Sequence, residues 1–251
     1  MRYAVLGSGS CGNSYIFKTA SSSFVVDNGY SFAEFRRRAE AFGFDISAIK
    51  YIFLTHIHRD HIAGVETLSN KLKIPVFTAE NLDLTGCTKK GFFKRVGITP
   101  GLSYNLDDFS FTVFPTFHDA PDSVGYSFKT GEGRYTIITD TGKTSPQMMA
   151  LAQESRVLFL ESNYCPDMLK KGPYPVWLQK RILSDYGHLS NFDALDFLKS
   201  LDCGSKRRVY LCHISDKNNT PERVQEVFDS VPLKNIEYII CKRGIPIMGE
   251  E

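Results

Sequence analysis

Short apolar runs alternate with amphipathic segments along almost the whole chain of 251 residues. Compact runs of β-branched and aromatic residues predict strands, at Ala4–Leu6, Tyr15–Phe17, Phe24–Val26, Tyr51–Leu54, Phe109–Phe114, Tyr135–Thr139, Val157–Leu160, Val209–Cys212 and Tyr238–Ile240. Apolar residues at helical spacing predict helices, at Phe32–Phe42, Ile62–Leu72, Trp177–Tyr186, Asn191–Leu201 and Pro221–Asp229. No Ser/Pro linker or low-complexity stretch interrupts this alternation, so we expect an α/β fold in a single domain over residues 1–251.

The most irregular part of the pattern is Thr85–Tyr104, where four glycines and several Lys and Arg surround Phe92 and Phe93. We expect an ordinary surface loop there, with a mobile flap beside a site as the alternative. Two of the predicted helices have recognisable N-terminal signals. Ser190 precedes Asn191, and Thr220 precedes a proline at the first helical position.

Near the N-terminus, Gly7-Ser-Gly-Ser-Cys-Gly12 matches the G-x-G-x-x-G spacing of dinucleotide-binding proteins. That fingerprint requires a helix to begin at the glycines, because the helix N-terminus holds the pyrophosphate. Here the predicted strand Tyr15–Phe17 follows instead. We therefore expect a tight, hairpin-like connection and no nucleotide cofactor.

The amino-acid composition indicates a globular protein without a strong overall charge. With 42% hydrophobic and 23% charged residues, the chain can bury a large core. A net charge of +2 creates no bulk field for nucleic acid, so such affinity must come from local clusters. The candidates are Lys170-Lys171, Lys180-Arg181 and Lys206-Arg207-Arg208, although clusters of this kind are usually solvated faces.

Cysteine usage and hydropathy bear on the compartment. The six cysteines show no C-x-x-C spacing, as expected for reduced thiols. No apolar run approaches the length of a membrane span or of a signal-peptide core. We expect a cytoplasmic protein without a membrane partner.

The segment His56-Ile-His-Arg-Asp-His61 carries the strongest chemical signal. Three imidazoles and one carboxylate lie within six positions, directly after the predicted strand Tyr51–Leu54. In an extended turn His56 and His58 point the same way and can hold one cation, and Asp60 and His61 face a neighbouring position. This mixture of donors suits zinc, iron or manganese, and the missing Cys pair argues against a closed structural zinc site.

Further candidate ligands follow other strands. Apolar runs deliver a His, Asp or Glu at their carboxyl end, in the segments that lead to His118, Asp140, Glu161 and His213. Each alone is more often a turn former or a structural residue. Their repeated position at the same strand end favours a shared site, because chance would scatter them over both edges of a sheet.

These residues together resemble the metallo-β-lactamase fold, an αββα sandwich, with the ligand set of its dinuclear phosphodiesterase branch. The resemblance is closest to the YycJ/WalJ-type family of bacterial and phage proteins and covers nearly the whole chain. Asp27 matches the first structural aspartate of the fold, and Asp27-Asn28-Gly29 departs from the usual Asp-Ala-Gly without loss of a ligand. The segments that carry the resemblance are Leu6-Gly-Ser-Gly-Ser-Cys-Gly-Asn-Ser14, His118-Asp119-Ala120, Glu161-Ser-Asn163, Gly172-Pro-Tyr-Pro175, Lys180-Arg-Ile-Leu183, Gly187-His-Leu-Ser-Asn191 and His213-Ile-Ser215 with Asn218-Asn219.

The resemblance implies two divalent cations, zinc or manganese, that generate a bridging hydroxide and clamp a phosphodiester. It assigns His56, His58 and His118 to one metal and Asp60, His61 and His213 to the other, with Asp140 bridging them. It also makes His188 the proton donor to the leaving group.

Glu161 has two readings. It can orient His188 or a ligand histidine, or be an exposed acid at a strand end. The expected catalytic residues are therefore His188, Asp60 and Glu161.

The family implies a nuclease, of the DNA exonuclease type. The alternative is a cyclic mononucleotide phosphodiesterase of the phage type that disarms immune signalling, which the near-neutral charge mildly favours. A lactam or thioester hydrolase is a weaker rival, because neither reaction needs the His188 motif. A non-enzymatic metal-binding module would require a broken ligand set. The expected partner is a nucleic-acid or nucleotide substrate, and a homodimer is left open.

Overall fold

Two mixed sheets of seven strands each pack face to face in the computed structural model, which describes residues 1–202 and 204–250. In the first sheet the order is β14 (Ile247–Glu250), β1 (Arg2–Gly7), β2 (Ser14–Lys18), β3 (Ser23–Val26), β4 (Ile49–Phe53), β5 (Pro75–Ala79) and β6 (Lys94–Ile98). In the second it is β13 (Ile236–Ile240), β12 (Arg207–Cys212), β11 (Ser155–Glu161), β10 (Gly133–Ile138), β9 (Val124–Thr130), β8 (Phe109–Pro115) and β7 (Ser103–Leu106).

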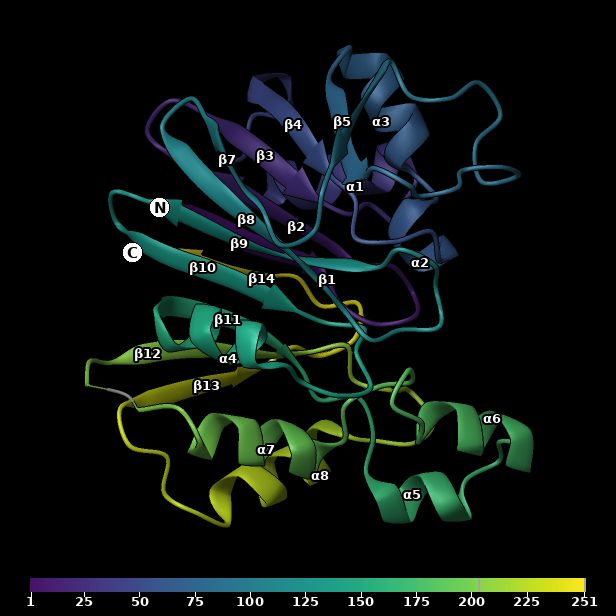
Figure 1. The fold of residues 1–251 in the computed structure, drawn as a ribbon, viewed down its shortest axis with the longest axis vertical. Helices are drawn as coiled ribbons and strands as arrows, with labels where there is room; N and C mark the ends of the chain where they lie inside the picture. Colours follow the sequence, from purple (N-terminus) through teal and green to yellow (C-terminus); the bar gives the residue numbers. More distant parts are fainter. Residues whose placement is uncertain (203, 251) are drawn as a thin grey trace.

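Helices cover the outer faces, so the layers run helix, sheet, sheet, helix (Figure 1). The helices are α1 (Phe32–Ala41), α2 (Arg59–Ile62), α3 (Val65–Leu72), α4 (Pro146–Gln153), α5 (Pro166–Lys171), α6 (Val176–Ile182), α7 (Asn191–Lys199) and α8 (Pro221–Asp229), with a 3-10 turn at Ile46–Ala48. This is the αββα sandwich expected from the sequence. Within the described residues, no helix combines the length and the apolar character needed to cross a bilayer.

Aromatic side chains fill the space between the sheets. Phe24 of the first sheet contacts Phe128 of the second with ring centroids 4.6 Å apart, and Phe17 packs edge-on against Phe159 at 5.8 Å. All four rings are fully buried. Burial of a phenylalanine side chain stabilises a fold by roughly 1.5–3 kcal/mol, so this layer holds the two sheets in register.

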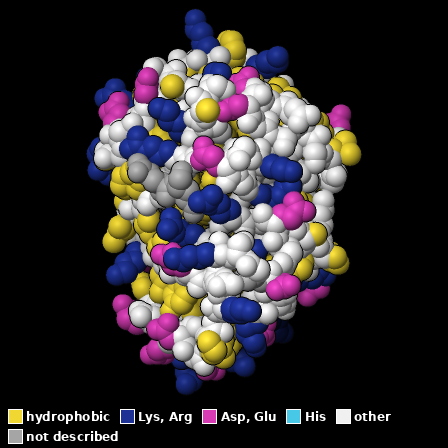
Figure 2. Space-filling model, turned by 90° about the vertical axis from the view of Figure 1, so that its left-hand side faces the viewer, with side chains coloured by type: hydrophobic (Ala, Val, Ile, Leu, Met, Phe, Trp, Pro, Cys, Tyr) yellow, Lys and Arg dark blue, Asp and Glu magenta, His cyan; other side chains and the backbone are white. Residues whose placement is uncertain are grey.

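Parallel strands bring the candidate ligands together. Strands β3, β4 and β5 are parallel in the first sheet, and β10 to β13 are parallel in the second. Their carboxyl ends meet at one edge of the sandwich, which is the usual location of ligand sites in α/β sheets. Figure 2 shows the opposite end of the molecule, where Lys and Arg are interspersed with Asp and Glu.

The predicted strands lie in the observed sheets, but several elements were missed: β5, β6, β7, β9 and β14 among the strands and α4 and α5 among the helices. The predicted loop Thr85–Tyr104 was wrong in part, because it contains β6 and the start of β7. β6 is an edge strand whose outward side chains are polar, so it lacks an apolar signal.

Two predicted helices were too long. Ile62–Leu72 is split into α2 and α3, because a Cβ at Gly64 would lie 1.8 Å from the carbonyl oxygen of Tyr30. Trp177–Tyr186 ends at Ile182, whose carbonyl oxygen accepts the backbone N–H of His188 at 3.2 Å. The helix starts at Ser190 and Thr220 are confirmed, and Ser190 forms a full capping box.

The N-terminal glycine segment connects the antiparallel strands β1 and β2, as the hairpin prediction requires. Gly12 has a positive φ of 141°, and a Cβ there would lie 2.7 Å from the Tyr30 ring. The glycines therefore allow close packing against Tyr30.

Candidate metal centre

The histidine-rich segment leaves β4 and is held down by the end of β3. Asp27, in the left-handed region with a φ of 55°, accepts hydrogen bonds from the Thr55 backbone N–H at 2.8 Å and from its hydroxyl at 2.7 Å. Asp27 also lies 2.7 Å from His61 Nδ1. Burial raises the pKa of Asp27, and His61 and Thr55 only partly offset it. Asp27 thus fixes the loop rather than entering the cavity.

Three histidines form the first candidate position. His56, His58 and His118 place ring nitrogens within 4.8 Å of one another, and His58 Nδ1 lies 3.1 Å from His118 Nε2. Burial lowers the pKa of all three, and for His56 the neighbouring imidazoles lower it further. Neutral imidazole is the form that binds a metal ion.

Asp60, His61 and His213 form the second candidate position, again with ligand atoms within 4.8 Å. His61 Nε2 and His213 Nε2 lie 3.6 and 3.7 Å from Asp60 Oδ2. Burial opposes protonation of His61, but Asp140, Asp27 and Asp60 raise its pKa to about 9. Carboxylates likewise raise the pKa of His213. A metal ion bound at this position would therefore replace protons on His61 and His213.

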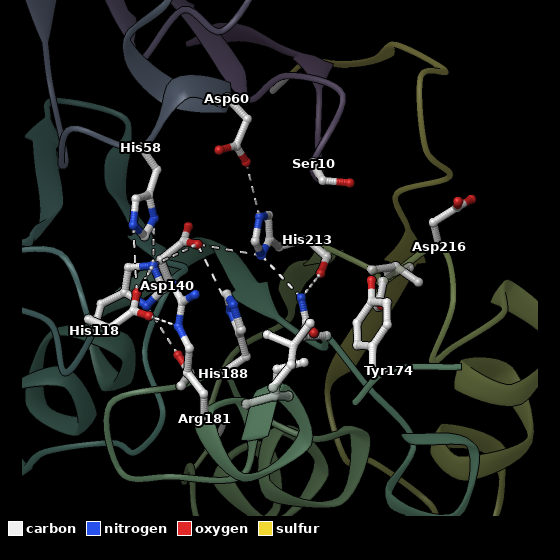
Figure 3. Close-up of a pocket in the computed structure, with 17 residues that line it drawn as sticks. Ser10, His58, Asp60, His118, Asp140, Tyr174, Arg181, His188, His213 and Asp216 are labelled. Atoms are coloured by element: carbon white, nitrogen blue, oxygen red, sulfur yellow. Dashed lines mark hydrogen bonds and ion pairs between the residues drawn. The ribbon is translucent and has the colours of Figure 1, made fainter. Parts of the chain in front are cut away.

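Asp140 lies between the two positions (Figure 3). Its Oδ1 is 3.7 Å from His118 Nε2, and its Oδ2 is 3.4 Å from His61 Nε2. Asp140 has a φ of 56° and is almost fully buried. One carboxylate oxygen is therefore available to each position, as a bridging ligand requires.

The histidine tautomers show which nitrogens are free for a metal. The Thr55 hydroxyl donates its hydrogen to Asp27. Its oxygen must therefore accept a hydrogen bond from His56 Nδ1, which lies 2.9 Å away. His118 Nδ1 donates to the Gly187 carbonyl at 3.2 Å. Acidic oxygens accept from His61 Nδ1 and His213 Nδ1 at 2.7 and 2.9 Å. In the neutral form of all four rings, Nε2 is therefore the nitrogen that keeps its lone pair.

Two of these ring nitrogens have protein neighbours within hydrogen-bond distance: His61 Nε2 lies 2.8 Å from Asn13 Nδ2, and His118 Nε2 lies 3.1 Å from His58 Nδ1. The other two, with one oxygen of Asp140, have none among the described residues. His56 Nε2, His213 Nε2 and Asp140 Oδ2 are buried and make no hydrogen bond in the described part of the chain. A buried polar atom without a partner is costly. Histidine ligands anchored through the other ring nitrogen are the common arrangement at metal sites. The donor atoms and their orientation therefore suit the binding of divalent cations.

Glu161 is fully buried, which rules out the exposed strand-end reading. Its Oε1 lies 2.7 Å from His188 Nδ1 and 2.9 Å from His213 Nδ1, and its Oε2 accepts the backbone N–H of Thr141 and Leu189. Burial opposes ionisation, but the two imidazoles hold the pKa of Glu161 below its usual range. Although Asp140, Glu161, His188 and His213 also cluster closely, these four hydrogen bonds already engage both oxygens of Glu161.

His188 projects from the segment between α6 and α7 beside the ligands (Figure 3). Its ring lies 5.1 Å from that of His118 and 5.2 Å from that of His213, and its side chain is 20% exposed. Because Glu161 fixes Nδ1–H, Nε2 is the nitrogen that can reach a substrate. His188 is the partly accessible member of an otherwise buried pair.

Several residues of the site were not predicted. Asn13 donates from Nδ2 to Asp60 Oδ2 at 3.0 Å, and its Oδ1 accepts the Gly9 backbone N–H at 2.7 Å. The Ser8 hydroxyl bonds the His213 backbone at 2.7 Å, and the Asn163 amide bonds the His213 carbonyl at 2.7 Å. The glycine segment therefore supports the ligands, and its polar residues were the available signal.

A cavity of about 250 Å³ opens onto the ligands. Leu178, Arg181 and Ile182 of α6 line one side, and Ser215 and Asp216 line another. Of the Lys180-Arg181 cluster, Arg181 thus lies at the site. The Lys206-Arg207-Arg208 cluster does not, because it begins β12 while His213 follows the end of that strand.

The chain matches the family model of the beta-lactamase superfamily domain over residues 23–214. It is 31% identical over 229 residues to exodeoxyribonuclease YycJ of Bacillus anthracis, covering 88% of this chain and 85% of that protein. It is 30% identical over 238 residues to exodeoxyribonuclease WalJ of Streptococcus pneumoniae, covering 88% and 84%. The metallo-β-lactamase fold protein YhfI of Bacillus subtilis superposes with a TM-score of 0.75 at 17% identity, covering 98% of both chains. The chain therefore belongs to the β-lactamase superfamily and, within it, to the metal-dependent hydrolases of the YycJ/WalJ type.

Proposed function

We propose that this chain is a dinuclear metal-dependent phosphodiesterase that acts as a nuclease of the DNA exonuclease type. The proposal rests on two clusters of possible metal ligands. Asp140 lies within reach of both clusters, and His188 lies beside them. Two relatives at 30–31% identity named exodeoxyribonucleases support the substrate class. Each cluster offers three ligands besides Asp140, which is the number an open catalytic zinc site uses.

Two bound cations would supply a nucleophile at neutral pH and neutralise charge on the phosphate. The protein supplies the positions and the proton. Asp27, Glu161 and Gly187 orient ligand imidazoles through Nδ1. His188 would donate a proton from Nε2 to the departing oxygen, while Glu161 stabilises the imidazolium through Nδ1. Zinc and manganese both suit these nitrogen and carboxylate donors.

The rival functions differ in what they need from the site. A lactam or thioester hydrolase has no use for the Glu161–His188 pair, and a metal-binding module has no use for a partly exposed His188. A cyclic mononucleotide would use the same ligands as DNA. No contact in the described residues favours the cyclic substrate, so it enters as an arm of the test.

The test incubates purified, metal-loaded protein with end-labelled DNA, labelled RNA and cyclic nucleotides, and with bis-(p-nitrophenyl) phosphate. We expect release of mononucleotides from DNA and loss of the activity on chelation. Faster turnover of a lactam or thioester than of any phosphodiester would contradict the proposal. Elemental analysis of protein never exposed to chelator should give close to two metal ions per chain. Sedimentation would decide the homodimer, which stays a prediction.

A further inference from the structure

Two short helices form an arm beside the metal cavity, which we call the α5–α6 arm (residues 166–182). It lies at the same edge of the sandwich as α2 (Figure 1). The buried side chains of Tyr164, Leu169 and Ile182 form a small apolar cluster of their own, with Leu178 packed against it. This cluster seats α6 firmly, so the side chains on its outer face have defined positions relative to the cavity.

Trp177 stands on the outer part of α6 with 65% of its surface exposed. It precedes the cavity-lining Arg181 by four residues, which places the two side chains on the same helix face about 6 Å apart along the axis. Burial of a tryptophan is favourable, and within the described residues this ring makes no aromatic stacking or cation–π contact. A flat aromatic surface is thus available one turn beyond the cavity rim.

The arm that carries this ring is rich in positive charge. The exposed Lys170, Lys171 and Lys180 have no carboxylate partner in the described part of the chain. Arg181 is bonded to Asp119 through Nε, which leaves both Nη groups without a partner there. One carboxylate, Asp167, is the only acidic side chain in the arm's sequence. The arm therefore matches a ligand with a run of negative charges.

The cavity cannot hold a polymer. Its volume of about 250 Å³ lies below the ~300–1,000 Å³ typical of pockets that enclose a whole ligand. A strand whose phosphate reaches the ligands must continue over the rim. Another part of the rim carries Asp216, whose carboxylate is already paired with Arg243 at 2.6 Å and Lys217 at 3.4 Å. The α6 side combines a rim cation, Arg181, with the exposed Trp177 ring, and so offers a strand both backbone and base contacts.

We propose that Trp177 is the platform on which a base of a single nucleic-acid strand stacks as the strand leaves the metal cavity, while the lysines of the α5–α6 arm hold its backbone. Such a combination of a stacking aromatic with a cationic track is how proteins bind single strands without reading sequence. The proposal rests on the proposed nuclease function and deepens it, because it sets how a polymer is positioned for cleavage.

Fluorescence tests the contact directly, because Trp177 is the only tryptophan of the chain. An oligothymidylate with phosphorothioate linkages, which resist hydrolysis, is added to the metal-loaded protein. A base stacked on the indole should quench the emission in proportion to binding. Emission that stays constant while the same oligonucleotide inhibits DNA hydrolysis would overturn the proposal. So would a shift that depends on protein concentration alone, which would assign the ring to contact between copies of the chain.

Kinetics supply the second readout. Trp177→Ala should raise KM for single-stranded DNA by about 5- to 150-fold, the equivalent of one lost base stack, with a much smaller change in kcat. Trp177→Phe should recover most of the affinity, since it keeps an aromatic face. Val176→Ala is the matched control, because Val176 is 66% exposed but projects about 100° away around the helix. It should leave KM unchanged.

The outcomes separate the two proposals. Wild-type protein that hydrolyses neither DNA nor bis-(p-nitrophenyl) phosphate would remove the nuclease function and this proposal with it. Wild-type protein that degrades DNA with a KM unaffected by Trp177→Ala would remove this proposal alone.

Discussion

Replacing the buried Glu161 with glutamine tests how the site positions its histidines. Glutamine has the same shape, but its amide nitrogen donates hydrogen bonds and cannot accept them. If the amide oxygen keeps the bonds to the backbone N–H groups of Thr141 and Leu189, the NH₂ group faces His188 Nδ1 and His213 Nδ1. Both rings must then move their proton to Nε2. His213 loses the lone pair that would bind a metal, and His188 loses the carboxylate that stabilises its charged form.

The expected decreases in rate and in metal affinity follow from these two losses. Removal of a group that orients a metal-bound histidine typically weakens metal affinity by about 10- to 100-fold. Loss of the acid behind a catalytic imidazole costs up to about 10⁴-fold in rate. We expect Glu161→Gln to lower kcat for DNA by roughly 10²- to 10⁴-fold and to release one of the two metals more readily on dialysis. Elemental analysis and initial rates at saturating metal separate the two effects.

The matched control is Glu154→Gln, just before the start of the same strand. Its side chain is 64% exposed and pairs with Arg134 at 3.0 Å, and exposed pairs of this kind contribute about 0–1 kcal/mol. It should leave metal content and rate unchanged. Full activity and full metal content in Glu161→Gln would refute the assigned tautomers. An equal deficit in both variants would point to general instability.

Three further predictions use the same assays. His188→Ala should keep both metals and lose about 10²- to 10⁴-fold in rate on DNA, with a smaller deficit for p-nitrophenyl esters, whose leaving group needs little protonation; an equal deficit for both substrates would refute the proton-donor role. Gly187→Ala should lower both activity and metal content, because the added Cβ would lie 2.1 Å from a carbonyl oxygen of α6, whereas Gly131→Ala, with nothing within 4 Å of the new atom, should be silent. Metal affinity at the second position should fall as the pH decreases below about 9, because His61 has a folded-state pKa of about 9 and must lose a proton to bind; equilibrium dialysis at several pH values that gives a flat profile for both metals would contradict this.

The residues at the ends of strands were the part of the site that the sequence could predict. His118, Asp140 and His213 each follow a strand-like apolar run, and the parallel register of β10, β11 and β12 brings two of those ends to one edge. Strand periodicity and strand direction are local and topological properties that apolar patterns record. The convergence of these strand ends could be predicted because the geometry of a parallel sheet supplies it.

The direction in which a side chain points at a strand end could not be predicted from the sequence. Glu161 follows Val157–Leu160 whether its carboxylate turns to solvent or into the core, and no local pattern separates the two. Its burial depends on His188, 27 positions later in the chain, and on His213, 52 positions later. The same long-range dependence hid Asn13, whose amide reaches Asp60 across 47 positions.

Edge strands and helix breaks were missed for a physical reason as well. β6 has one buried residue, Ile98, so burial leaves little trace in its sequence. The break between α2 and α3 is set by the approach of Gly64 to the Tyr30 backbone, with the Gly64 N–H donating to Asn28 at 2.8 Å. A glycine inside a helical pattern signals such an approach only weakly.

Asn28 shows how the site tolerates its departure from the family pattern. Its carbonyl accepts from Gly64, its backbone N–H donates to the His61 carbonyl at 2.8 Å, and its Oδ1 accepts the Tyr30 N–H at 3.1 Å. An alanine would keep the two backbone contacts and lose only the side-chain one. Asparagine therefore adds a turn-forming bond at the base of the histidine loop without entering the ligand set. Because its Nδ2 is buried without a hydrogen-bond partner in the described chain, that gain is reduced by an unsatisfied donor. Asn28→Ala should accordingly change the free energy of unfolding by no more than about 1 kcal/mol and leave both metals in place; loss of a metal in that variant would mean that the loop, and not its ligands alone, determines affinity.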